Sequence, residues 1–261
     1  MNDAHLGLEG SGWCRGVQRK LVGEAERLLS SFVREMNEVE RPLFVVNLGD
    51  SIEHAGDPEV DASLLRRAGA LLAPLAMPCH SLIGNHDVAT LSHAEAAVIL
   101  GLERVHYSFD ADDFHFVVLG FDPAEPGEVV VPREQLAWLR EDLAATRKPT
   151  VVFSHYGIAD DSMEGNFWFA ENPDHALISN RAHVRTCLER SGKVKAVISA
   201  HQHWNRMIVH EGIPYVTVTS LVENTRNDGV PAEAFSLVDL DAAGMTLDVR
   251  GNDPARFHHL F

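Results

Sequence analysis

Several stretches of the chain repeat apolar residues at three- and four-residue spacing, which predicts helices that bury one face. The longest covers residues 17–36, and its apolar stripe consists of Val17, Leu21, Ala25, Leu28, Leu29, Phe32, Val33 and Met36. Similar patterns predict helices over about residues 62–72, 93–100 and 181–190. A further helix is expected to open with Pro132 at its first position, where proline is well tolerated. We expect Asn180 and Gly192 to cap the helix between them.

Short apolar runs predict buried strands. In the first three quarters of the chain they cover residues 43–48, 79–83, 105–109, 114–120, 150–154 and 194–199. Later runs cover residues 204–210, 215–219, 234–240 and 245–249. The sequence Asp-Ala-Ala-Gly at residues 241–244 is typical of a hairpin turn between the last two.

The order of these elements indicates the fold class. Strands and helices alternate at first, whereas strands dominate after residue 200. This order favours an α/β protein in which two mixed β-sheets pack face to face with helices outside, a four-layer α/β sandwich. The 261 residues are enough for one large core, and we expect residues 1–261 to form a single domain.

The formal net charge of −16 narrows the range of partners. Phosphate-rich surfaces repel such a protein, which argues against binding to nucleic acid or to an anionic membrane. A small phosphate can still bind if bound cations reverse the local field. No apolar run approaches the length of a membrane span, and the sequence as written has no signal peptide pattern. The cysteines Cys14, Cys79 and Cys187 fit reduced, mostly buried thiols, so we expect a cytoplasmic protein.

Residue types that bind metals or transfer protons follow four of the predicted strands. In chain order they are Gly49-Asp50, Gly84-Asn85-His86-Asp87, His155 and His201-Gln202-His203. Ligand sites of open α/β sheets lie beyond the carboxyl ends of the strands, where these residues fall. Taken singly, each has a bland alternative, such as a solvated histidine or an ordinary Gly-Asn turn. Because four strands are followed by such residues, we favour a common site at the edge where the carboxyl ends of these strands meet.

Asp3 and His5 would add two metal ligands if they ended a strand, because side chains two residues apart then point to the same side. The alternative is a frayed, polar terminus. Only Met1 and Asn2 precede the pair, so the strand that should deliver it is missing, and neighbouring strands would keep unpaired backbone groups. We expect an upstream segment, another segment or another subunit to fill the gap. In the sequence as written, an ion held by Asp3 and His5 would rest on a frayed end of the chain, so it is predicted to bind more weakly than a second one.

The five blocks together resemble the calcineurin-like metallophosphoesterases. The blocks that carry the resemblance, in the order typical of that family, are Asp3-x-His5, Gly49-Asp50, Gly84-Asn85-His86-Asp87, His155 and His201-x-His203. Residues 134–139 also look like the stretch that precedes the fourth block. Within the family, the chain is similar to the branch that includes ADP-ribose and CDP-alcohol diphosphatases. Two positions depart from the pattern: Ala200 stands where glycine is usual, and Glu53 where phosphatases often have aspartate.

The resemblance implies a dinuclear site for two divalent or trivalent transition-metal ions. One ion would be held by Asp3, His5 and His203, which we call the first-ion group. The other ion would be held by Asn85, His155 and His201, the second-ion group. Asp50 would bridge the two ions. Nitrogen and oxygen ligands without thiolate suit Mn, Fe, Zn or Ni better than Mg or Ca.

The implied function is that of a metal-dependent phosphoesterase. Such a hydrolase would cleave a small phosphate ester or nucleoside diphosphate derivative by in-line attack of a metal-bridging hydroxide. His86 would act as general acid or phosphate clamp, with Glu53 or Asp87 as its partner. The predicted catalytic residues are therefore His86, Asp50 and Glu53. The alternative is a scaffold or binding protein that keeps the fold without the chemistry, which the missing first strand favours.

Two segments without a clear period, residues 122–131 and 156–179, are expected to select the substrate. Long irregular loops in compact domains are commonly functional, so residues 156–179 are a candidate lid over the site. The alternative is that the aromatic side chains of this segment form a small core of their own; they are Phe167, Trp168 and Phe169. Acidic residues near the expected mouth would disfavour long polyanions; they are Asp160, Asp161 and Glu164.

Overall fold

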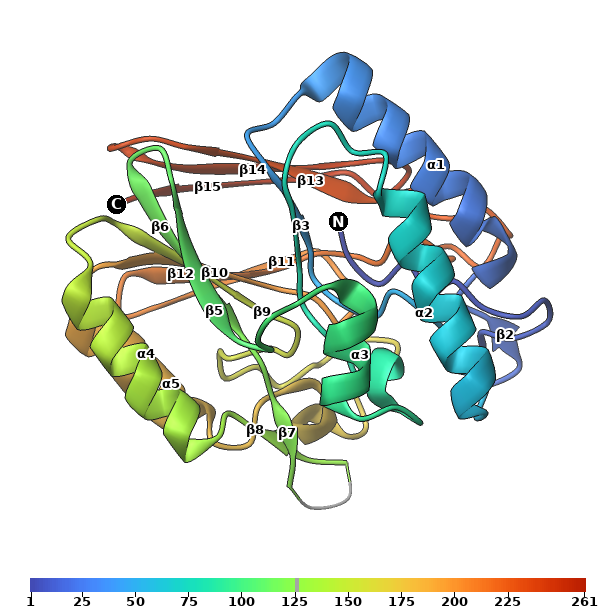
Figure 1. The fold of residues 1–261 in the computed structure, drawn as a ribbon, viewed down its shortest axis with the longest axis horizontal. Helices are drawn as coiled ribbons and strands as arrows, with labels where there is room; N and C mark the ends of the chain where they lie inside the picture. Colours follow the sequence, from blue (N-terminus) through green and yellow to red (C-terminus); the bar gives the residue numbers. More distant parts are fainter. Residues whose placement is uncertain (125–126) are drawn as a thin grey trace.

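A six-stranded mixed β-sheet forms the centre of the computed structural model, which describes residues 1–124 and 127–261 (Figure 1). The strand order is β11-β12-β10-β9-β6-β5. Strands β6, β9, β10 and β12 run parallel, and β5 and β11 pair antiparallel at the two edges. The bounds are Tyr107–Ala111 (β5), Phe114–Leu119 (β6), Thr150–Ser154 (β9), Val194–Ser199 (β10), Arg206–His210 (β11) and Ile213–Thr217 (β12).

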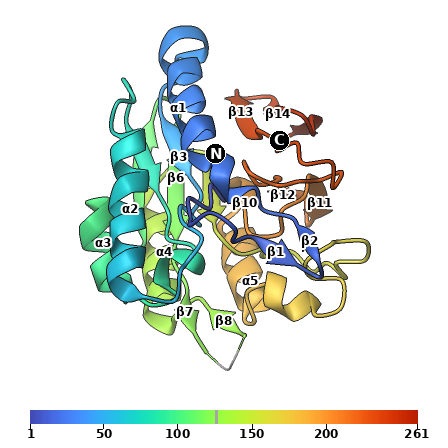
Figure 2. The same ribbon diagram turned by 90° about the vertical axis from the view of Figure 1, so that its right-hand side faces the viewer.

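A second, smaller layer of strands faces this sheet (Figure 2). It contains an antiparallel group and a parallel pair, namely β13 (Phe235–Leu240), β14 (Gly244–Arg250) and β15 (Ala255–Leu260), and β3 (Val45–Asn47) with β4 (Cys79–Ser81). Met245 and Leu247 of β14 are buried in one core with Phe116, Val151 and Ile198 of the large sheet. This apolar core joins the two layers.

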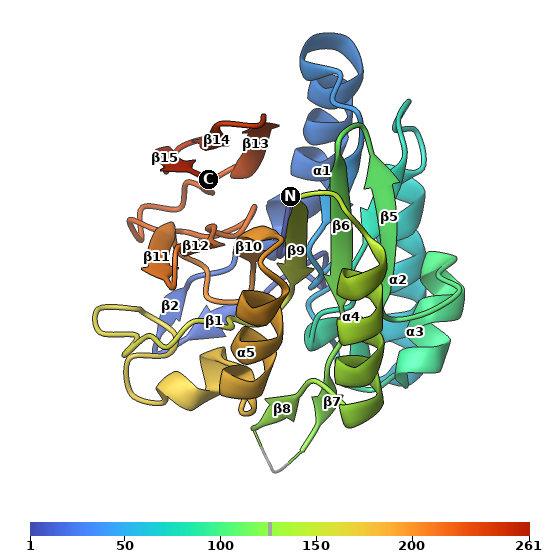
Figure 3. The same cartoon turned by 90° about the vertical axis from the view of Figure 1, so that its left-hand side faces the viewer.

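Helices cover the outer faces of both layers (Figure 3). On the side of the second layer lie α1 (Ala25–Glu35), α2 (Pro58–Leu72) and α3 (His93–Leu100). There Leu29 and Leu65 share a core with Val45 of β3. The other face of the large sheet is covered by α4 (Arg133–Ala145) and α5 (Arg181–Ser191), with Leu139 and Leu188 packed near Val152. The predicted fold class is confirmed, with a second β-layer that is small.

The predicted helix over residues 17–36 begins later than its apolar pattern suggests, at Ala25. The elements around it are β1 (Trp13–Cys14), β2 (Val17–Gln18), the 3-10 turn η1 (Val22–Glu24) and, after α1, the π-helical turn η2 (Met36–Glu40). The N–H group of Leu21 donates to the carbonyl oxygen of Val222 at 2.9 Å. Pairing with a distant segment therefore overrides the local helical period at the start of this stretch.

Other boundaries differ from prediction by smaller amounts. Pro132 precedes α4 in an extended conformation and is not its first helical residue. The side chain of Asn180 bonds to the backbone of Val131 instead of capping α5, whereas Gly192 ends that helix in the left-handed conformation, as predicted. Sequence patterns missed the short strands β1, β2, β7 (Asp122–Pro123) and β8 (Val129–Val130), and also missed β15.

Residues 1–6 are buried and hydrogen-bonded, so the expectation of a frayed terminus is wrong. Asp3 and His5 are fully buried. The N–H group of Asp3 donates to the carbonyl oxygen of Gly49 at 3.0 Å, and the hydroxyl of Ser220 donates to the Asp3 carbonyl oxygen at 2.7 Å. The segment therefore lies between two later parts of the chain, which satisfy its backbone groups (Figure 2).

A cavity of about 590 Å³ remains beside this segment, between β3 and β13. Met1, Val46 and Leu237 are among the residues that line it. The expectation that a further segment or subunit completes this region stays a prediction. The reason given for weak binding at Asp3 and His5, a loose end of the chain, does not hold in the structure.

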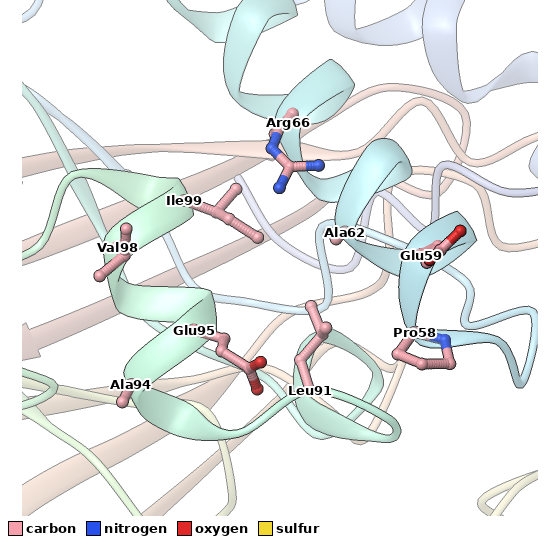
Figure 4. A pocket seen from close by; sticks show the side chains of 9 residues that line it. All are labelled: Pro58, Glu59, Ala62, Arg66, Leu91, Ala94, Glu95, Val98 and Ile99. Carbon is pink, nitrogen blue, oxygen red and sulfur yellow. The ribbon is translucent and has the colours of Figure 1, made fainter.

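A groove of about 570 Å³ lies between α2 and α3 (Figure 4). Leu91, Val98 and Ile99 line it together with the charged side chains of Glu59 and Arg66. It shares no lining residue with the strand ends that carry the predicted ligands.

The three cysteines are free thiols, and they differ in burial. Cys187 is buried, Cys14 is half-buried and Cys79 is exposed, so the expectation of mostly buried thiols holds for Cys187 alone. Among the helices of residues 1–124 and 127–261, none combines the length and the apolar character that crossing a membrane requires.

Candidate metal centre

The ligand-type residues that follow four strands meet at one edge of the two layers. Asp50 lies beyond β3 and Asn85 beyond β4, while His155 directly follows β9 and His201 lies two residues beyond β10. Within each of these pairs the strands are parallel, so their carboxyl ends point the same way. The sheet topology thus brings together residues that are far apart in the sequence.

The first-ion group, Asp3, His5 and His203, forms one buried cluster, in which one ligand atom of each lies within 4.8 Å of the others. The Nε2 atoms of His5 and His203 are 3.1 Å apart, and His203 Nε2 is 3.6 Å from Asp3 Oδ1. Among the described residues, Asp3 Oδ1 has no hydrogen-bond partner although it is buried. A buried carboxylate oxygen without a partner is costly, and a cation would satisfy it.

Asp50, His155 and His201 form a second buried cluster, again within 4.8 Å. His155 Nε2 is 3.4 Å from Asp50 Oδ2 and 3.1 Å from Asn85 Oδ1, so the whole second-ion group comes together. Asp50 Oδ2 is also 3.9 Å from His5 Nε2. Asp50 therefore lies between the two groups, which is the position that a bridging ligand requires.

Backbone strain is frequent among the candidate ligands. Five of the seven have a φ in the left-handed region, namely Asp3 (49°), His5 (45°), Asp50 (51°), His201 (64°) and His203 (53°). Asp and His enter this region more readily than most residues, but the conformation still costs about 1–3 kcal/mol each. Such strain persists only where the surrounding structure holds it, and it is typical of functional sites.

Two glycines allow the loops after β3 and β4 to approach each other. A Cβ atom on Gly84 would lie 2.2 Å from Asp50 Oδ1. Gly49 has a φ of +95°, and its Cβ would lie 2.6 Å from the backbone nitrogen of Gly84. Ala200, where the family usually has glycine, is buried and is not among the residues with positive φ. Its methyl group is therefore accommodated without backbone strain.

Without an ion, the carboxylates of the two groups hold protons on nearby imidazoles. Burial disfavours a charge on His155, but the carboxylate of Asp50 outweighs burial and raises the pKa of His155 to about 9. Asp3 does the same for His203, whose pKa is also raised to about 9. Burial and the charge of His155 lower the pKa of His201 to about 3. Protonated His155 and His203 thus balance Asp50 and Asp3 in place of cations.

His86 lies in the 3-10 turn η3 (His86–Val88), beside the first-ion group. Its Nδ1 atom is 2.9 Å from His54 Nδ1 and 3.3 Å from Glu53 Oε2, and its Nε2 atom is 3.4 Å from Lys20 Nζ. Burial lowers the pKa of His86 well below its ordinary value. His5, Glu53 and His86 are also close enough to form a third group that could hold an ion.

The structure distinguishes the two carboxylates that the sequence offered as partners of His86. The oxygens of Asp87 accept hydrogen bonds from three backbone N–H groups, those of Ser51, Ile52 and Gly84. Burial and the nearby charge of Asp50 raise the pKa of Asp87 to about 7. Asp87 therefore ties the loop after β4 to the loop after β3, and Glu53 is the carboxylate in contact with His86.

Sequence reasoning named Glu53 but missed the other charged residues behind the imidazoles of the first-ion group, which are Glu223, Arg19 and Lys20. Glu223 Oε2 is 2.7 Å from His203 Nδ1, and Arg19 Nε donates to Glu223 Oε1 at 2.7 Å. Behind His5, Glu53 Oε2 is 3.0 Å from Nδ1, off the line of a straight hydrogen bond, and it accepts from Lys20 Nζ at 2.5 Å. The only sign of this arrangement in the sequence is that the basic residues Arg19 and Lys20 are adjacent. Nothing in the local sequence pattern connects this pair to the site.

The imidazoles of the second-ion group are supported by the backbone instead. His155 Nδ1 is 2.8 Å from the carbonyl oxygen of Leu48, and His201 Nε2 is 3.1 Å from the carbonyl oxygen of His175. In each ring the other nitrogen remains available as a ligand.

The segment of residues 156–179 lies against the histidines. The ring centroid of Phe169 is 4.8 Å from that of His201, and the centroid of Trp168 is 5.5 Å from that of His203. The segment contains the 3-10 turn η4 (Pro173–Ala176) and a small core of its own, formed by Met163, Ala176 and Leu177 with Phe169 packed against it. Phe169 thus packs against this small core and also lies beside His201, while a role of the segment as a lid stays a prediction. The other proposed selectivity segment, 122–131, includes residues 125 and 126, which lie outside the described part of the chain.

Comparisons with known proteins point to one family. The family described as calcineurin-like phosphoesterase matches residues 1–205. A search of the curated proteins finds no match. Among solved structures, a dimetal phosphatase from Danio rerio is 18% identical, with a TM-score of 0.76 over 100% of this chain and 97% of that one.

Two more distant structures share the fold. A purple acid phosphatase from yellow lupin (Lupinus luteus) seeds is 14% identical, with a TM-score of 0.68 over 98% of this chain and 52% of its own. The anchor protein of the inner membrane complex of Plasmodium is also 14% identical, with a TM-score of 0.60 over 98% of this chain and 87% of its own. At these identities the likeness shows the fold alone.

Proposed function

The chain belongs to the calcineurin-like phosphoesterases, and we propose that it hydrolyses a small phosphate ester or a nucleoside diphosphate derivative with two metal ions. The observation that carries the proposal is the position of Asp50. Its Oδ2 atom is 3.4 Å from His155 Nε2 and 3.9 Å from His5 Nε2. One carboxylate within reach of both clusters suits a pair of ions that share a ligand, as two-metal sites with a spacing of about 3.5–4 Å require.

The donor atoms fit transition-metal ions such as Mn, Fe or Zn, because they combine imidazole nitrogens with carboxylate and amide oxygens. The buried and unpartnered Asp3 Oδ1 supports a cation at the first position. We assign one ion to the first-ion group and the other to the second-ion group, with Asp50 shared. When bound, such ions would lower the pKa of a water molecule and neutralise the phosphoryl oxygens.

His86 is proposed to act on the substrate. Glu53 Oε2, 3.3 Å from His86 Nδ1, would orient the ring and stabilise its protonated form. Nε2 could then give a proton to the leaving oxygen or hydrogen-bond to a phosphoryl oxygen. An anionic phosphate beside the ring would favour the imidazolium, against the burial that lowers the pKa of His86 in its absence.

The alternative of an inactive scaffold depended on a missing first strand. Residues 1–6 are instead buried between two later parts of the chain, and Asp3 and His5 reach the first-ion cluster. Family membership and the assembled ligand groups favour a hydrolase. We further propose that residues 1–261 act as one domain, with residues 156–179 as a lid that excludes water from the histidines.

Hydrolysis of bis-p-nitrophenyl phosphate and p-nitrophenyl phosphate tests the proposal. The protein is stripped of metal and assayed with and without added Mn²⁺, Zn²⁺ or Fe²⁺. We expect turnover that depends on metal, and the ratio of the two rates will separate a diesterase from a monoesterase. Absence of turnover with every ion, in protein shown to bind two ions per chain, would contradict the proposal.

A further inference from the structure

The two ion positions differ in what supports their imidazoles. Each ligating histidine has a second ring nitrogen that faces away from the ion. Behind the first-ion group this nitrogen faces a glutamate, Glu223 for His203 and Glu53 for His5. Behind the second-ion group it faces a backbone carbonyl oxygen.

Both glutamates are held by neighbouring residues of one short segment. Arg19 contacts Glu223 and Lys20 contacts Glu53, and this segment follows the β1–β2 hairpin. Two adjacent cations thus reach two carboxylates that are 170 residues apart in the sequence. The backbone adds to this arrangement, because Lys20 and Glu223 form an isolated β-bridge.

Hydrogen-bond contacts connect Arg19 through Glu223 to His203. Glu223 is fully buried, and its Oε1 atom accepts hydrogen bonds from Arg19 Nε at 2.7 Å and from Trp168 Nε1 at 3.2 Å. Arg19 Nη1 also donates to the carbonyl oxygen of Thr225 and the side chain of Asn227, each at 2.9 Å. With Oε1 satisfied by these donors, Oε2 faces His203 Nδ1 at 2.7 Å. The guanidinium of Arg19 thus pairs with a carboxylate that is buried.

The contact through Lys20 reaches the same imidazole cluster from the other side, where the Glu53 carboxylate lies close to His5 without a hydrogen bond to it. Lys20 Nζ lies 2.5 Å from Glu53 Oε2, which in turn lies 3.0 Å from His5 Nδ1. The ammonium group also lies 5.3 Å from the ring of Trp168, the residue that donates to Glu223. The two supports therefore meet at one side chain of segment 156–179. Figure 2 shows the β1–β2 hairpin beside this segment.

A carboxylate behind a ligating imidazole fixes the tautomer and raises the basicity of the ring, and its loss typically lowers metal affinity about 10- to 100-fold. A neutral carbonyl oxygen fixes the tautomer but brings no net charge. The first-ion position therefore gains basicity that the second-ion position lacks. We propose that Arg19 and Lys20 are positioning residues that hold Glu223 and Glu53 behind His203 and His5, and that the first-ion position consequently binds its ion more tightly than the second.

This inference rests on the proposed dinuclear site, and it reverses the order of affinities expected from the sequence. The experiment is a titration of metal-stripped protein with Mn²⁺ in competition with a chelator, which gives an affinity for each ion without any substrate. Variants Glu223→Gln, Arg19→Gln and Lys20→Met are compared with the unchanged chain. Glu223→Gln keeps the size of the side chain and removes only its charge. Thermal unfolding of each metal-free variant checks that it is folded.

Two further variants identify the classes of site. Asn85→Ala removes a ligand of the second-ion group, so it should abolish the weaker class and leave the tighter one. Arg27→Gln is the matched control. Arg27 also pairs with glutamates, Glu24 and Glu233, but these ion pairs are exposed and neither glutamate lies behind a metal ligand. We expect Glu223→Gln, Arg19→Gln and Lys20→Met each to weaken the tighter class about 10- to 100-fold, with little change in the weaker class and none in Arg27→Gln.

The titration distinguishes a failure of the proposed function from a failure of this inference. If the unchanged chain binds fewer than two ions, both the proposed function and this inference are wrong. If it binds two ions and hydrolyses phosphate esters, but the support variants leave the tighter class unchanged or weaken both classes equally, the inference alone is wrong. Loss of the tighter class in Asn85→Ala would also overturn it, because the order of the two positions would then be reversed.

Discussion

The first-ion and second-ion groups reach the same site by different means. Asn85, His155 and His201 lie just beyond regular strands, and backbone carbonyl oxygens support the two imidazoles. Asp3 and His5 come from a segment with little regular structure, and the first-ion imidazoles face two glutamates that contact the basic residues after the β1–β2 hairpin. Sheet topology thus largely builds one half of the site, whereas specific side-chain contacts build the other. The supports of the first half can be removed by substitution, but those of the second half cannot.

Asp50→Asn should have the largest effect, because it changes the residue that lies between the two halves. The amide carries no charge to balance two ions, so we expect at most one ion per chain and turnover at background level. Metal content by mass spectrometry and hydrolysis of bis-p-nitrophenyl phosphate measure the two effects. Asp57→Asn is the control, since Asp57 caps α2 and Asn caps equally well. Retention of two tightly bound ions in Asp50→Asn would show that the halves do not share this ligand.

His86→Ala should separate catalysis from metal binding. We expect turnover to fall about 10²- to 10⁴-fold, because a proton donor or phosphate contact is lost, while both ions are retained. The exposed His183 of α5 provides the control, His183→Ala, with unchanged turnover. Loss of one ion in His86→Ala would instead assign His86 to the metal, through the third group of His5, Glu53 and His86.

The second half of the site is also the half that the sequence predicts well. β10 was predicted over its observed bounds, residues 194–199, and β9 likewise over 150–154. Parallel strands bring their carboxyl ends to one edge, so His155 and His201 could be placed together from patterns alone. Local apolar runs carry this information, because a buried parallel strand needs apolar residues on both faces.

The first half depends on contacts that no local pattern encodes. Residues 17–21 lie in a pattern of apolar side chains typical of a helix, but the backbone of residues 17 and 18 pairs with β1, and that of residues 19–21 pairs with the segment around Val222. The same pairing places Arg19 and Lys20 beside Glu223 and Glu53. A short polar terminus likewise suggested fraying, because its hydrogen-bond partners lie 45 to 219 residues later in the chain. Tertiary context decides these positions, and a single sequence does not reveal it.

The pH dependence of metal binding tests whether both halves must lose a proton. His155 and His203 have pKa values raised to about 9 without ions, so both carry protons at pH 7, whereas His201, with a pKa lowered to about 3, carries none. Ligation requires neutral imidazoles, so each half should release about one proton per ion. Affinity at each position should therefore rise with pH, up to about tenfold per unit, and level off above about pH 9. Calorimetry in buffers of different ionisation enthalpy counts the protons, and a count near zero would contradict the assigned ligands.

Gly84→Ala should have the smallest effect and should fall unequally on the two halves. The added Cβ would lie 2.2 Å from Asp50 Oδ1 and 2.3 Å from the backbone nitrogen of Asp50, so the loop must shift, at a cost of about 1–3 kcal/mol in the free energy of unfolding. Because Asn85 is the next residue, the shift should weaken the second-ion position more than the first. Thermal unfolding and metal titration measure both effects. Gly23→Ala is the control, since its added Cβ would meet no atom within 4 Å. Equal weakening at both positions would mean that Asp50 transmits the shift, and that the two halves are less independent than their separate supports indicate.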